Sequence, residues 1–138
     1  MAAGMSDIRK ALADRLNTFG DFQAYEYIPD AVNAPGGFIE PDRPFVNYQH
    51  VFQSGQVKWN FVLTILVNRS EERDAQKELD EYLDPEGAFV TLLQSDEDGD
   101  ELDDICSYVT VTAGTRYGAY AMGGTTYLGA QLEFVVSA

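Results

Sequence analysis

One stretch of the chain constrains the fold more than any other, because it alternates two kinds of residue over 13 positions. The stretch is QVKWNFVLTILVN, from Gln56 to Asn68. Its odd-numbered positions are all apolar or aromatic, whereas its even-numbered positions begin polar and become mostly apolar. This period of two predicts a β-strand. Because the second half is apolar on both sides, we expect a central strand with helix covering one face.

The rest of the chain shows further helix and strand patterns. Residues 7–18 have apolar side chains at helical spacing after an N-cap, Ser6, and before a stop at Gly20. A second helix follows the cap Ser70, buries a stripe of Ala75, Leu79, Tyr82 and Leu83, and ends at 84–87; a short helix covers 88–95. Strands are predicted at 22–28, 105–113, 116–122 and 125–138, the last two as a hairpin. Turns fill 29–37, and two prolines make any strand in 37–45 short or an edge strand.

This order of elements predicts an α+β fold. We expect an antiparallel or mixed β-sheet with two or three helices packed on one face. A chain of 138 residues is long enough to bury one core. The predicted organisation is a flexible leader at 1–5 and a single domain at 6–138.

The charge of the chain limits its partners. The net charge is −14, from 23 acidic and 9 basic residues. Such a surface repels nucleic acid and anionic membranes. The single cysteine, Cys106, excludes an intrachain disulfide and fits a reducing compartment. The N-terminus lacks an apolar signal region, and the stretch from Trp59 to Val67 is too short to span a bilayer. We therefore expect no membrane partner.

Many of the acidic residues lie in one run near the middle of the second half. They are Asp96, Glu97, Asp98, Asp100, Glu101, Asp103 and Asp104. A calcium-binding EF-hand loop needs glycine at its sixth position and glutamate at its twelfth. A loop starting at Asp96 has Glu101 and Ser107 there, and one starting at Gln94 ends on Ile105. We therefore expect a solvated acidic loop and no metal site.

No catalytic constellation stands out from the sequence. His50 is the only histidine, so neither a zinc site nor a Ser–His relay is supported. Cys106 opens a predicted strand and suits a small core residue. The glycines of GTRYGAYAMGG lack the spacing of a phosphate-binding loop. We expect a binding or assembly protein rather than an enzyme, with no cofactor.

Four segments carry a resemblance that extends over most of the chain. They are MSDIRKALADRL, AYEYIPDAVNAPGGFIEP, WNFVLTILVNRSEERDAQKELDEYLD and the ending GGTTYLGAQLEFVVSA. In their order and spacing the chain resembles the small tail terminator proteins of long-tailed phages, particularly those of phages of actinobacteria. The resemblance implies a tail-terminator-like fold, a sheet with helices against it, and no active site.

The resemblance also implies an assembly. Tail terminators form a homo-oligomeric, six-fold ring on the major tail tube protein, at the head-proximal end of the tube. The ring stops tube growth and joins the tail to a head-side connector or stopper protein. The protein would then be made in the host cytoplasm and lie at the head–tail junction of the virion.

Two segments gain possible roles in such a ring. DNA passes through the channel without specific binding, so the run Asp96–Asp104 either faces the lumen and repels the duplex or lies on the outer, solvated surface. The proline- and glycine-rich segment Pro29–Pro44 is predicted to be a loop; it either contacts a neighbouring subunit or the tube, which we favour, or is a plain surface excursion. The apolar residues proposed for this contact are Ile28, Val32, Phe38 and Phe45.

Two other functions compete with tail termination. One is another neck component, such as a head-closure or stopper protein, which shares the size and charge of a terminator. The more remote one is a small-molecule-binding or hydrolytic domain, which requires a pocket with converging polar groups.

Overall fold

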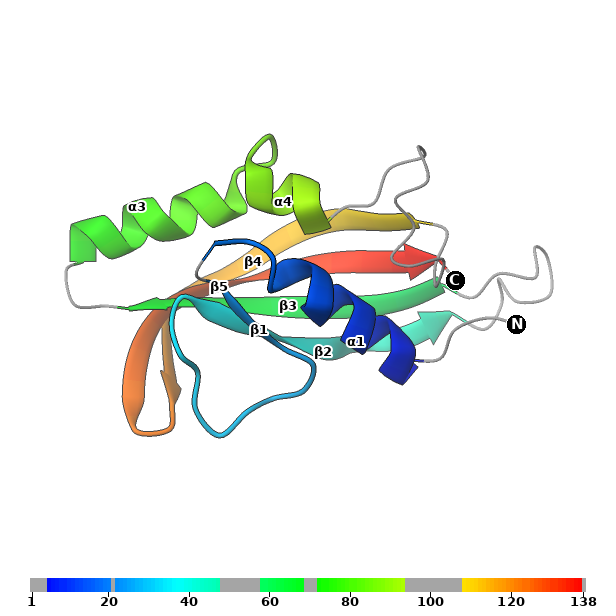
Figure 1. Cartoon of the computed structure of the whole chain (residues 1–138), viewed down its shortest axis with the longest axis horizontal. Helices are drawn as coiled ribbons and strands as arrows, with labels where there is room; N and C mark the ends of the chain where they lie inside the picture. Colours follow the sequence, from blue (N-terminus) through cyan, green and yellow to red (C-terminus); the bar gives the residue numbers. More distant parts are fainter. Residues whose placement is uncertain (1–4, 21, 48–57, 69–71, 94–107, 138) are drawn as a thin grey trace.

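The computed structural model describes residues 5–20, 22–47, 58–68, 72–93 and 108–137, and they form an α+β fold (Figure 1). The elements in chain order are α1 (Met5–Leu16), β1 (Gln23–Tyr25), β2 (Gly36–Asn47), β3 (Lys58–Asn68), α3 (Glu72–Leu83), α4 (Ala88–Leu93), β4 (Tyr108–Met122) and β5 (Thr125–Ser137). The strands form one sheet in the order β1-β2-β3-β5-β4. Only β1 and β2 pair in parallel, so the sheet is mixed. The predicted fold class is confirmed.

β3 is the central strand, as its alternating pattern predicts. It pairs with β2 on one side and with β5 along its whole length on the other. Phe61, Leu63 and Ile65 lie on the face toward the helices and are fully buried. On the opposite face Thr64 and Leu66 are buried as well. The second half of β3 is therefore covered on both sides, which explains why its sequence is apolar at almost every position.

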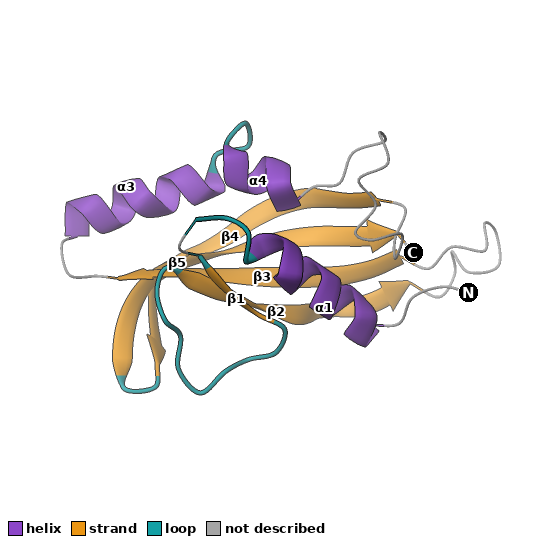
Figure 2. Cartoon of the chain, viewed as in Figure 1, coloured by secondary structure: helices purple, strands orange, loops and turns teal. Residues whose placement is uncertain are grey.

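The three described helices cover one face of the sheet (Figure 2). Each of them contributes to a single apolar cluster, called the main cluster here, together with inward-facing residues of β2, β3, β4 and β5. The helix members are Ile8, Ala11, Leu12, Ala13, Leu16, Ala75, Leu79, Tyr82, Phe89 and Val90. They include the apolar stripes that helical spacing predicts for α1 and α3. Aromatic rings join α3 and α4 to the segment after α1, with centroids 4.8 Å apart for Phe22 and Phe89.

A smaller apolar cluster lies on the opposite face of the sheet, where the β4–β5 hairpin curls away (Figure 1). The buried members of this second cluster are Val32, Phe38, Leu66 and Tyr127. The Tyr127 hydroxyl donates a 2.8 Å hydrogen bond to the carbonyl oxygen of Val32. The hairpin turn has φ angles of 60° at Gly123 and 79° at Gly124. These angles suit the predicted glycine turn, and a Cβ at Gly123 would lie 2.8 Å from the Asp30 carbonyl oxygen.

The first two strands differ from their predicted lengths. β1 has three residues because the chain then turns toward α1, where Arg9 donates a 3.2 Å hydrogen bond to the Glu26 carbonyl oxygen. A strand in 37–45 was expected to be short or at an edge. It is not short, because β2 has 12 residues, but beyond Phe38 it has no described partner on its outer side. Its pairing with β3 is irregular between Pro41 and Val46, and β1 flanks only its first residues. Pro41 is the last regular pair before this irregular stretch and Pro44 lies within it; β1 flanks neither proline, so no ladder hydrogen bond is required of them on that side.

β4 is one strand of 15 residues, whereas the sequence predicted two strands separated at Gly114. Two register shifts against β5, between residues 111 and 113 and between residues 115 and 118, interrupt the pairing without ending it. Arg116 lies in the second shift with a φ of 54°. β-Bulges of this kind add residues to one strand and bend it, so a glycine-containing strand continues through them.

The helix boundaries agree with prediction to within about one turn. α1 begins at Met5, so Ser6 lies inside the first turn and is not the N-cap. Met5 itself packs against the main cluster, so it belongs to the domain and not to a leader. α3 ends at Leu83, directly before the predicted stop. The predicted cap Ser70 lies outside the described residues.

Candidate interaction surfaces

The structure separates the four apolar residues that were predicted to contact a neighbouring subunit or the tube. Val32 and Phe38 expose only 4% and 7% of their surface and belong to the second cluster. Their apolar side chains therefore pack within the chain itself, and the prediction that they contact a partner is corrected. Ile28 and Phe45 expose 60% and 45% and remain available to a partner. The predicted loop is also shorter than expected, because β2 takes up its second half.

The acidic run Asp96–Asp104 lies outside the described residues, as do His50 and Cys106. Its orientation toward a lumen or toward solvent stays a prediction.

One candidate surface lies beside the outer side of β2. Tyr27, Ile28 and Phe45 are exposed there, and we call these three residues the β2-edge patch. They border a hollow of about 460 Å³, which is also lined by Arg9, Ile39, Glu40, Pro41 and Asp42. The Arg9 guanidinium lies 4.4 Å from the centre of the Tyr27 ring, a cation–π contact that fixes the chain after β1. Phe45 is exposed because it falls in the bulge of β2.

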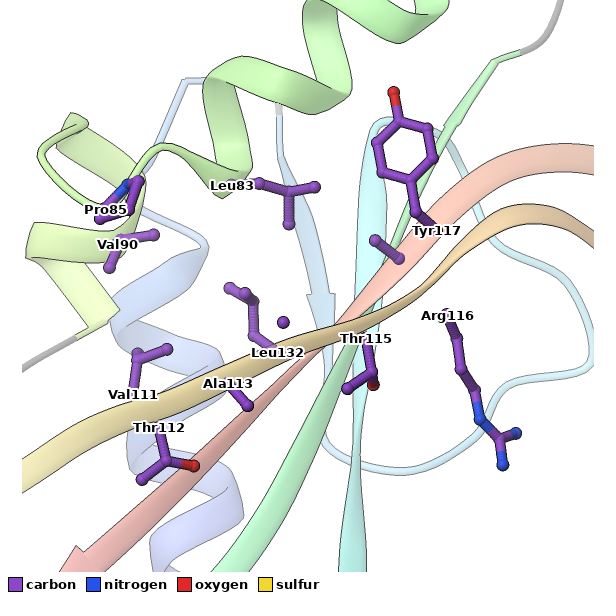
Figure 3. Close-up of a pocket in the computed structure, with 12 residues that line it drawn as sticks. Leu83, Pro85, Val90, Val111, Thr112, Ala113, Thr115, Arg116, Tyr117 and Leu132 are labelled. Atoms are coloured by element: carbon purple, nitrogen blue, oxygen red, sulfur yellow. The ribbon is translucent and has the colours of Figure 1, made fainter.

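A second candidate surface is an apolar groove of about 550 Å³ between the α3–α4 corner and β4 (Figure 3). We call it the β4 groove. Its lining residues are Leu83, Pro85, Val90, Val111, Thr112, Ala113, Gly114, Thr115, Arg116, Tyr117, Ala130 and Leu132. Figure 3 shows the Arg116 side chain pointing away from the helices, while Tyr117 lies on their side of the strand. Apolar side chains thus form the walls, and Arg116, although it borders the groove, directs its charge toward the opposite face of the sheet.

Tyr117 connects β4 to α3 at the mouth of this groove. Its hydroxyl donates a 3.0 Å hydrogen bond to Asp80, although the side chain is 48% exposed. Partial burial, followed by the hydrogen bond and negative charge of Asp80, raises the pKa of Tyr117. The tyrosine is therefore neutral at physiological pH and acts as a hydrogen-bond donor, not as a base.

A polar hollow of about 510 Å³ lies on the face of the sheet that the helices leave uncovered. Glu133 of β5 and Asp42 of β2 both line this hollow. Desolvation, then the hydrogen bond and charge of Asp42, raises the pKa of Glu133. Nearby, the Gln131 amide donates a 3.2 Å hydrogen bond to the buried Thr64 hydroxyl. Arg116 also lines this hollow and supplies its positive charge.

Sequence reasoning did not identify the β4 groove or the Glu133–Asp42 contact. The alternation in β5 does place Glu133 on the face opposite Leu132 and Phe134, so its orientation was readable. Its partner was not readable, because the contact depends on the register of β2 across β3. The groove depends on how the α3–α4 corner docks on β4, which no local pattern encodes.

These surfaces offer apolar contact, hydrogen bonds and charge, and no donor set for a metal. Within the described ranges there is no group of three or more His, Cys, Asp or Glu residues that could hold a metal ion. None of the described helices has the length and apolarity needed to cross a bilayer. Neither a comparison with protein-family models nor a search of curated proteins finds a match to the chain.

Proposed function

We propose that this chain is a structural virion protein that terminates the tail of a long-tailed phage. In this proposal copies of the chain form a ring on the head-proximal end of the tail tube. The ring stops tube growth and presents a surface to the head-side connector. The reaction chemistry of an enzyme plays no part in it.

One observation carries the proposal: the helices cover a single face of the sheet, and exposed apolar surface lies beside the outermost strands instead of in an enclosed site. A subunit that repeats around an axis needs surface for a neighbour on two sides and further surface for the tube or connector. The order and spacing of the sequence segments support the same proposal, since they resemble tail terminators and imply a sheet with helices against it.

The charge of the chain is consistent with a channel for DNA. With a net charge of −14 per copy, a ring accumulates strong negative potential, which repels a polyanion that passes through it. Lysine and arginine side chains facing the channel would instead bind phosphate and slow the passage of DNA. The run Asp96–Asp104 is the segment we propose for the lumen.

The experiment is electron microscopy of particles assembled without this protein, with the wild-type chain supplied in trans as the control. A terminator predicts tails of uncontrolled, excessive length that fail to join heads. Tails of normal length that remain unjoined would favour the alternative of a head-closure or stopper protein. Normal tails joined to heads would contradict both neck functions.

A further inference from the structure

We draw no further inference here: the strongest candidate, the apolar groove between the α3–α4 corner and β4, carries none because nothing among the described residues shows what covers it.

Discussion

The two faces of the sheet bury apolar side chains by different means. On one face, α1, α3 and α4 cover the strands and form the main cluster with them. On the other face, the described residues that provide cover belong to the segment around Val32 and to the β4–β5 hairpin, and they form the small second cluster at one end. The remainder of that face carries the polar hollow with Glu133 and Asp42. Among the described residues, the helix-covered face therefore supplies most of the core, while the other face is largely polar.

β3 allows a direct comparison of the faces, because neighbouring leucines on it point in opposite directions. Leu63 is fully buried in the main cluster, and Leu66 is 1% exposed in the second cluster. We expect Leu63→Ala to lower the free energy of unfolding by about 4 kcal/mol and Leu66→Ala by about 2.5 kcal/mol. The difference arises because the loop and hairpin can relax into a cavity more easily than three packed helices.

Chemical denaturation of the two variants measures this difference. Equal losses, or a larger loss for Leu66→Ala, would contradict the assignment of the main stabilising role to the helix-covered face.

The hydrogen bond that closes the second cluster gives the next largest effect. Tyr127→Phe removes the donor to the Val32 carbonyl oxygen and leaves this buried acceptor unpaired. We expect the free energy of unfolding to fall by about 1 kcal/mol, measured by chemical denaturation. Tyr117→Phe is the matched control, because it removes an exposed hydrogen bond to Asp80 and should cost less. A loss for Tyr117→Phe as large as for Tyr127→Phe would show that the second cluster does not depend on this buried bond.

The smallest effect concerns the uncovered face and depends on pH. Because the folded state raises the pKa of Glu133 above its ordinary value of 4.5, it binds this proton more tightly than the unfolded state does. The contribution of Glu133 to the free energy of unfolding is present at low pH. It is lost as the pH rises from 4.5 through the raised pKa of the folded state. Glu133→Gln should make the free energy of unfolding less dependent on pH in this range and raise it by about 0.5 kcal/mol at neutral pH.

Unfolding curves recorded from acidic to neutral pH test this expectation. Asp42→Asn relieves the same contact. The increases in the free energy of unfolding that Asp42→Asn and Glu133→Gln cause should therefore not add in the double variant. Full additivity, or an unchanged pH dependence in Glu133→Gln, would contradict a direct contact between the two carboxyls.

The parts of the fold that local patterns encode were predictable. The alternation in β3 predicted its central position, and the stripe of Ile8, Leu12 and Leu16 predicted the buried side of α1. The paired glycines at 123 and 124 gave the hairpin turn, because both need a positive φ. Errors arose where irregular pairing overrides a local signal, as in the bulges that carry β2 past its prolines and β4 past Gly114.

The candidate surfaces were less predictable, for a physical reason. An apolar residue in a loop looks the same in sequence whether it packs inward or faces a partner. Val32 and Ile28 are four positions apart, yet one is buried by Tyr127 and its neighbours and the other is 60% exposed. The difference depends on the hairpin, which is nearly a hundred residues away in sequence, and only tertiary structure brings it to the loop.

The measurement that tests the account most directly is the position of this protein in the assembled virion, determined by electron cryomicroscopy. The account predicts a ring at the head–tail junction whose subunits fit the sheet with helices on one face. Density for the protein anywhere other than the head–tail junction, or its absence from the particle, would contradict the account.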